Sequence, residues 1–180
     1  MTLKSLSTFG LQKFTRGLVF ISPLLFFPIS LHQSTYNITE SEVSIITSIN
    51  NITRDISKKS LYTIAQTVDY ISKVENIKPS LILAIIHTES NFKHNIDNGY
   101  GTGLMQIVSS VHNIKKKILL DPTQNIIIGT RIYKECREKS KSDKEALARY
   151  NGPWKLQAGV IYSKKVLASQ RIFEINLHKS

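Results

Sequence analysis

The chain has 180 residues, 41% of them hydrophobic, which suits one globular domain with a buried core and a possible tail. Its net charge of +11 suits an anionic polymer as partner, and a solvated basic surface without a partner explains the charge equally well. The sequence shows neither zinc-finger spacing nor an aromatic and basic RNA-binding motif, and the single cysteine, Cys136, excludes an internal disulfide.

The first segment of the chain resembles a signal for export. The first 16 residues carry basic side chains and no acidic one, and Gly17 to Leu31 then runs without a charge. This apolar run is interrupted by prolines and is shorter than the ~20 residues that a spanning helix needs. We therefore predict that residues 1–31 are a secretory signal whose cleavage site the sequence does not indicate; an uncleaved membrane anchor is the alternative.

Helical periodicity begins after a polar stretch. Residues 32–60 are rich in Ser, Thr, Asn and Ile and are interpreted as a linker that passes into a weak leading helix. From Leu61 onward apolar residues recur with helical period, which predicts a helix that ends near Asn76. Pro79 suits the first turn of a second helix, and Leu81 to Ile86 is apolar on every side. This second helix is therefore predicted to be buried.

Glu89 stands at the end of this predicted buried helix. It shares one face with Leu81 and Ile85 through i,i+4 spacing. It also lies near the C-terminal end of the helix, where the dipole disfavours a negative charge. Burial and this field both raise the pKa of a carboxyl. Glu89 is thus a candidate general acid, although a glutamate at the exposed end of a helix fits the same pattern.

A polar loop rich in asparagine and glycine follows Glu89. Three glycines alternate from Gly99 to Gly103, which permits positive φ or a close approach of the backbone to a ligand. We expect a small irregular ribbon at most in this loop. Asp97 is the only other acid between Glu89 and Gln106, and it is expected to cap a turn.

Further helices are predicted after the loop. The first runs from Ser109 to Leu120 and the second from Asn125 to Lys139. A short third helix, Glu145 to Tyr150, follows a predicted N-cap at Asp143 and ends at Asn151-Gly152-Pro153.

The end of the chain is predicted to contain one more core helix. Trp154 to Gly159 is interpreted as a loop and Val160 to Ser169 as the last core helix. Residues 171–180 are a C-terminal tail without an assignment. No strand pattern of useful length appears anywhere, so the predicted fold class is all-α.

Three motifs in a fixed order resemble a known enzyme family. Glu89-Ser90, Gly103-Leu104-Met105-Gln106 and Tyr150-Asn151-Gly152 are similar to motifs of the lytic transglycosylases with a goose-lysozyme-like domain. The resemblance covers about Ile64 to Val166. A finer resemblance, to small stand-alone members that accompany secretion and conjugation machines, depends on a further set of residues: Leu119-Leu120-Asp121-Pro122, Asn125, Ile128-Gly129 and Tyr162 with Lys165-Val166.

The resemblance implies an all-α, lysozyme-like catalytic domain over residues 61–170 and a lyase that cleaves the β-1,4 bond between N-acetylmuramic acid and N-acetylglucosamine. It implies that Glu89 protonates the leaving oxygen, with assistance from the N-acetyl group at the anomeric carbon. Glu89 would then take the proton of the same sugar's 6-hydroxyl, which closes a 1,6-anhydro ring. No cofactor and no metal are implied, and His87, His94 and His112 show no zinc-like spacing.

The same resemblance gives the substrate-binding residues, which are Ser90, Met105, Gln106, Tyr150 and Asn151, with Tyr150 placed against Glu89. Other roles remain open for three of them. Ser90 also suits a hydrogen bond at the helix end, Met105 suits core packing, and Asn151 suits the turn after Tyr150.

Three rival functions remain. A true lysozyme would use a second carboxylate, for which Asp97 is the candidate. A glycan-binding or assembly protein would keep the fold without catalysis, and the intact Glu89 argues against it. A nucleic-acid binder would show binding that falls steeply with salt and is indifferent to Glu89.

The expected partners are peptidoglycan glycan strands, which suit the basic charge, and components of a secretion or conjugation apparatus, with no nucleic acid. The expected location is the periplasm, with an inner-membrane anchor if the signal is not cleaved. The related small enzymes often carry a cysteine pair in this region, and Thr123 stands where the partner of Cys136 is expected. Cys136 is therefore expected to be a buried, small hydrophobic residue.

Overall fold

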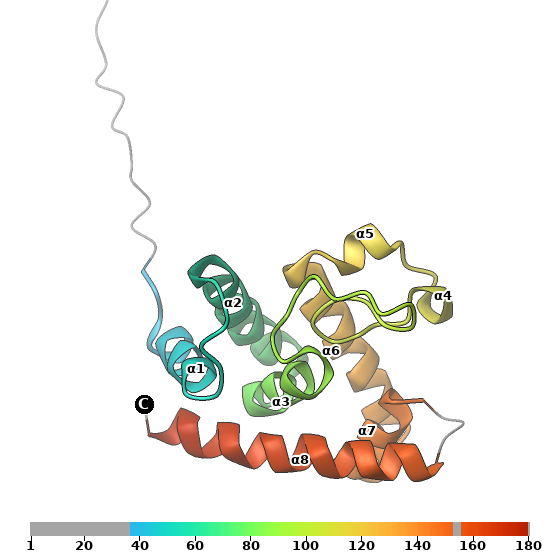
Figure 1. Ribbon diagram of the computed structural model, residues 1–180. Coiled ribbons are helices and arrows are strands. Elements are labelled where there is room, and N and C mark those ends of the chain that lie inside the picture. The colour runs from blue at the N-terminus through green and yellow to red at the C-terminus, as the bar shows by residue number, and fades with distance from the viewer. Residues whose placement is uncertain (1–36, 153–155, 180) are drawn as a thin grey trace, which may run out of the picture. The chain divides into compact units, whose positions relative to one another are not determined.

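Helices account for all the regular secondary structure in the part of the chain that this computed structural model describes, residues 37–152 and 156–179 (Figure 1). This agrees with the predicted all-α class. The predicted signal, residues 1–31, lies outside the described residues. None of the described helices combines the length and the apolar content that crossing a membrane requires. In chain order the helices are α1 (Glu40–Asn50), α2 (Lys58–Glu75), α3 (Pro79–Ser90), α4 (Ser109–His112), α5 (Lys116–Leu119), α6 (Pro122–Glu138), α7 (Asp143–Tyr150) and α8 (Leu156–His178).

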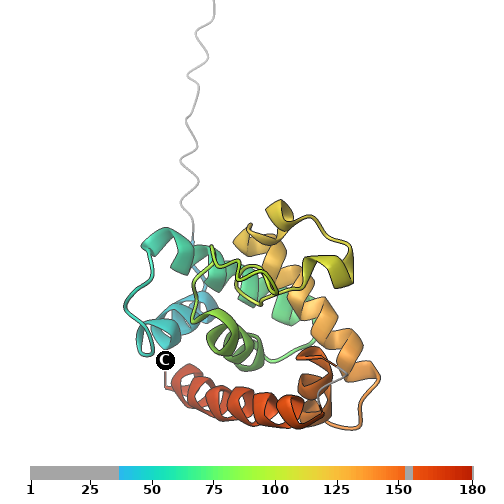
Figure 2. The same cartoon turned by 45° about the vertical axis from the view of Figure 1, so that its right-hand side comes forward.

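Helix α3 lies at the centre of the core, as its all-round apolar sequence predicts. Pro79 occupies its first turn, where the missing amide hydrogen costs nothing. Every residue from Ser80 to Ile86 is buried. The helix packs against α2 on one side and along α8 on the other, and both views show α8 running beneath it (Figures 1 and 2).

Helix α1 belongs to the folded domain and is more than a weak leading element of a linker. Thr39 and Glu42 form a capping box, in which each side chain accepts a hydrogen bond from the other residue's amide. Ile45 and Ile49 are fully buried, and the helix packs on α2 and α8. The folded domain therefore begins before residue 61.

Helix α8 is longer at both ends than predicted. It begins at Leu156, inside the segment interpreted as a loop, and continues to His178 through the segment interpreted as a tail. Phe173 in this extension is fully buried and meets the rings of Phe92 and His87 at centroid distances of 6.1 and 6.0 Å. Apolar burial thus holds the predicted tail in the helix.

The predicted helix from Ser109 to Leu120 is two short helices, α4 and α5. Asn113 between them adopts a left-handed conformation with φ of 52°, which asparagine tolerates better than most residues. Val111, which the helical pattern places in the core, is 70% exposed. The apolar spacing of this segment therefore misleads, because only Leu119 of the two helices is buried.

Helices α6 and α7 begin slightly earlier than predicted. Asp121 caps α6 by accepting from the Gln124 amide at 2.8 Å, and Pro122 starts the helix. Ser142, rather than Asp143, caps α7. Asp143 instead accepts a hydrogen bond from the Tyr133 hydroxyl, and this bond joins the start of α7 to α6.

Candidate active site

Glu89 lies in the last turn of α3, where the chain leaves the core. Asn91 and Phe92 directly after it have positive φ, 49° and 64°, and turn the backbone sharply away from the helix axis. Phe92 is buried beside Phe173 of α8, which fixes this turn. Glu89 is therefore held at the edge of the core by packing on both sides of the turn.

The environment of Glu89 favours the protonated acid. Burial raises its pKa from the ordinary value of 4.5 to about 7. The Tyr162 hydroxyl of α8 donates a hydrogen bond to Glu89 Oε1 at 2.7 Å and acts in the opposite direction, because it favours the carboxylate. A carboxyl with this pKa can both give and take a proton near neutral pH.

The glycine loop is held in place by one buried side chain, Asn125 of α6. Asn125 Nδ2 donates to the carbonyls of Thr102 and Leu119, both at 2.8 Å, and its Oδ1 accepts from the Met105 amide at 2.7 Å. A Cβ on Gly103, which has φ of 79°, would collide with the Asn125 side chain. Asn125 thus satisfies three backbone groups of a buried loop that lacks regular pairing.

The loop contains the small irregular ribbon that the sequence indicates. Its regular pairing is limited to two isolated antiparallel bridges among the described residues, from Thr102 to Asp97 and from Thr102 to Ile107. Gln106 follows with φ of 48°. Its Nε2 donates to the Gly103 carbonyl at 2.7 Å and its Oε1 accepts from Asn98 Nδ2 at 2.9 Å, so its side chain is fixed at the surface of the loop.

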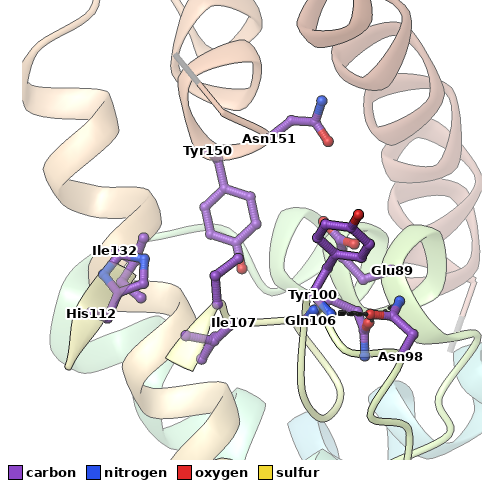
Figure 3. Close-up of a pocket in the computed structure, with 11 residues that line it drawn as sticks. Glu89, Asn98, Tyr100, Gln106, Ile107, His112, Ile132, Tyr150 and Asn151 are labelled. Carbon is purple, nitrogen blue, oxygen red and sulfur yellow. Dashed lines mark hydrogen bonds between the residues drawn. The ribbon is translucent and has the colours of Figure 1, made fainter. Parts of the chain in front are cut away.

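A hollow of about 200 Å³ lies between this loop and the end of α7, with Glu89 in its wall (Figure 3). Gln106 and Asn98 border it on the loop side, and Tyr150 and Asn151 border it on the α7 side. Tyr100 stands at its rim with 84% of its surface exposed. The amide groups of Asn98, Gln106 and Asn151 and the exposed ring of Tyr100 therefore surround the acid with hydrogen-bonding groups and an aromatic surface.

A second hollow of about 340 Å³ lies on the α8 side of Glu89. Asn151 and Glu89 border both hollows. We refer to the two hollows, which have Glu89 and Asn151 in common, as the groove.

Tyr150 borders the same hollow as Glu89, and burial and then the negative charge of Glu89 raise the pKa of Tyr150, but its hydroxyl does not bond the carboxyl. Its hydroxyl donates to the Met105 carbonyl at 2.8 Å, and its ring stacks on Tyr162 with centroids 6.4 Å apart and planes at 18°. The hydroxyl that donates to the Glu89 carboxyl is that of Tyr162. The finer family resemblance includes Tyr162 but gives it no role, and its pairing with Glu89, 73 residues away, leaves no local signal in the sequence.

The structure divides the other predicted binding residues into two groups. Gln106 and Asn151 line the hollow. Ser90 is buried and donates to the Ile86 carbonyl at 3.0 Å, and the Met105 side chain is buried against Gly129 of α6. The side chains of Ser90 and Met105 therefore have the helix-end and core-packing roles, and neither residue borders a hollow; the Met105 carbonyl instead accepts the hydrogen bond of Tyr150.

Asp97, the candidate second carboxylate, lies outside both hollows. It accepts from the Gly99 amide at 3.1 Å, as expected of a turn cap, and forms an ion pair with Lys116 Nζ at 2.7 Å. These two hydrogen bonds lower its pKa. Among the described residues that border the two hollows, Glu89 carries the only carboxyl.

Histidines near the site have separate roles. His112 borders the hollow, and His87 Nδ1 is 2.9 Å from the Ser169 hydroxyl in the core. Within residues 37–152 and 156–179, no three His, Cys, Asp or Glu side chains are arranged to hold a metal ion.

Comparison with known proteins agrees with this geometry. The profile of the Transglycosylase SLT domain matches residues 66–165, more than half of the chain, and this range includes Glu89, the glycine loop, Tyr150 and Tyr162. No solved structure matches the chain. The chain therefore belongs to the Transglycosylase SLT family and is a peptidoglycan lytic transglycosylase, a lyase with a lysozyme-like, all-α catalytic domain.

Proposed function

We propose that Glu89 is the sole catalytic carboxyl of this transglycosylase and that the product is a 1,6-anhydro-N-acetylmuramic acid end. The observation that carries the proposal is the single carboxyl between the two hollows, with its pKa raised to about 7 by burial. At this pKa about half of the molecules hold the proton at neutral pH, so one group can serve as acid and then as base.

The reaction proceeds in two steps. In the first, Glu89 gives its proton to the oxygen that links the two sugars, and the bond from this oxygen to C1 of N-acetylmuramic acid breaks. The carbonyl oxygen of the 2-acetamido group bonds to C1 as the leaving sugar departs. In the second, the 6-hydroxyl oxygen of the same sugar bonds to C1, the acetamido oxygen leaves, and the hydroxyl proton returns to Glu89.

Two features suit this cycle: the Tyr162 hydroxyl, and Glu89 as the only carboxyl among the described residues that border the two hollows. The Tyr162 hydroxyl, 2.7 Å from Glu89 Oε1, stabilises the carboxylate that exists between the two steps. Attack by a hydroxyl that already belongs to the bound sugar has a large advantage in effective concentration over attack by water. A carboxylate to activate water is therefore not required.

Glu89→Gln tests the role of this residue. Glutamine keeps the size and shape but has no proton to transfer, so release of soluble fragments from purified peptidoglycan should cease. Circular dichroism and binding of glycan strands should stay as in the wild type. Residual digestion close to the wild-type rate would move the catalytic role to another residue.

We also propose export to the periplasm, on the basis of the basic and then apolar pattern of residues 1–31. Retention of this segment would anchor the enzyme in the inner membrane. Fractionation of cells should recover the protein outside the cytoplasm. Recovery of the full-length chain from the soluble cytoplasmic fraction would contradict export.

The finer family resemblance supports local opening of the wall for a secretion or conjugation apparatus. Deletion of the gene should reduce transport through that apparatus while growth and bulk wall turnover continue. The wild-type gene should restore transport, and the gene for Glu89→Gln should not. Restoration by the inactive variant would indicate an assembly role without catalysis.

A further inference from the structure

The hollow on the α8 side of Glu89 has a chemical character different from that of the hollow beside the glycine loop. Ala158, Ile161, Tyr162 and Lys165 of α8 border it. Their spacing of three, four and seven residues places them on one face of the helix. This face presents, in order along the helix, a small residue, an apolar surface, the hydroxyl that holds Glu89, and an ammonium group.

Lys165 is an exposed cation at the edge of this hollow. Several other basic residues of the described chain form ion pairs, for example Lys116 with Asp97 and Lys134 with Glu75. No carboxylate of the described residues lies within ion-pair distance of Lys165, since the ion pairs there involve other residues: Lys73, Lys78, Lys116, Arg131, Lys134, Arg137 and Arg149.

Ile161 supplies an apolar surface next to this charge. It is 52% exposed although it is a large hydrophobic residue, and it lies one helical turn before Lys165. Ala158, one turn earlier again, leaves space where a larger side chain would fill the hollow. A ligand that matches this face has a short apolar group followed by a carboxylate.

Peptidoglycan contains such a group on only one of its two sugars. N-acetylmuramic acid carries a lactyl ether with a methyl group, which ends in a free carboxylate or continues through an amide into a peptide that has carboxylates of its own. N-acetylglucosamine carries no charge. We propose that Lys165 binds a carboxylate of the muramyl substituent and so selects strands that contain muramic acid over uncharged polymers of N-acetylglucosamine. The proposal uses the groove at Glu89 but does not depend on the course of the reaction.

Binding measurements in the Glu89→Gln background test this proposal, because the ligands are not consumed. Three ligands of equal sugar length separate the carboxylate sources: strands with their peptides, strands freed of peptides with an amidase, and the uncharged N-acetylglucosamine oligomer. Lys165→Ala should weaken binding of a carboxylate-bearing ligand about two- to fivefold, the range for a solvent-exposed ion pair, and leave the uncharged oligomer unaffected. The loss should shrink as salt concentration rises.

Lys164 provides a matched control. It is the neighbouring residue on α8, is equally a lysine and is exposed, but it does not border the hollow. Lys164→Ala should therefore bind all three ligands as the parent does, and Lys165→Arg should retain most of the affinity for the carboxylate. A loss confined to peptide-free strands assigns the lactyl carboxylate, and a loss confined to peptide-bearing strands assigns a peptide carboxylate.

Three results would overturn the proposal. They are equal losses for Lys164→Ala and Lys165→Ala, a loss for Lys165→Ala that extends to the uncharged oligomer, and no loss with any ligand. Digestion by enzymes with an intact Glu89 is a separate measurement, so a failure of the catalytic proposal would not be mistaken for a failure of this one.

Discussion

Replacement of Glu89 by glutamine should change how folding stability depends on pH. Burial raises the pKa of Glu89 from 4.5 to about 7 in the folded protein. Between these values the unfolded chain releases the proton while the folded chain keeps it, so this residue lowers the free energy of unfolding as pH rises. Well above pH 7 the whole penalty is present, and glutamine, which has no charge at any pH, removes it.

The size of the effect follows from the shift. One pKa unit corresponds to about 1.4 kcal/mol, and integration from about pH 5 to about pH 8.5 gives roughly 2.5 kcal/mol. Relative to wild type, Glu89→Gln should therefore gain roughly 2.5 kcal/mol in free energy of unfolding between these two pH values. Urea unfolding followed by circular dichroism at both pH values measures this quantity directly.

Glu135→Gln is a suitable control, because Glu135 is an exposed glutamate on α6. Its stability relative to wild type should be nearly the same at both pH values. The reasoning is refuted if Glu89→Gln behaves like this control, since the carboxyl of Glu89 would then titrate alike in the folded and unfolded states.

Three other substitutions test the surroundings of the site. Tyr162→Phe removes a hydrogen bond that favours the carboxylate of Glu89. The alkaline limb of the pH–rate profile should therefore move to higher pH, and kcat should fall roughly tenfold. An unchanged profile would contradict this. Asn125→Ala leaves three buried backbone groups without their partner. In urea titrations it should lower the free energy of unfolding by about 3 kcal/mol or more. A loss below about 1 kcal/mol would be inconsistent with this role. Cys136→Ser should digest peptidoglycan within about twofold of the wild-type rate, because Cys136 is partly buried and borders neither hollow. A large loss of activity with the fold intact would show that the thiol has a role in the reaction.

The buried helix and its terminal acid could be predicted from sequence because both signals are local. The apolar run of α3 and the position of Glu89 depend on spacing within one helix. The contact between Glu89 and Tyr162 depends on how α8 packs on α3, which no local pattern encodes. The family resemblance places Tyr150 against Glu89, but in the structure the Tyr150 hydroxyl donates to the Met105 carbonyl and Tyr162 donates to the carboxyl.

Local sequence signals also mark the helices at the two ends of the folded domain, α1 and the C-terminal part of α8. Thr39 and Glu42 have the spacing of a capping box, which indicates the start of α1. Val166 and Phe173 are seven residues apart and both fully buried, so helical period continues into the segment interpreted as a tail. By contrast, the break at Asn113 follows from a left-handed residue that an apolar pattern cannot reveal.

Mass analysis of the products from purified peptidoglycan tests the central claim most directly. If Glu89 works without a second carboxyl, wild-type enzyme should release muropeptides that end in 1,6-anhydro-N-acetylmuramic acid, lighter by one water than lysozyme products, and Asp97→Asn should release the same ones. Glu89→Gln should release none. Reducing-end products from the wild type, with loss of activity in Asp97→Asn, would contradict the account and identify a hydrolase that uses water.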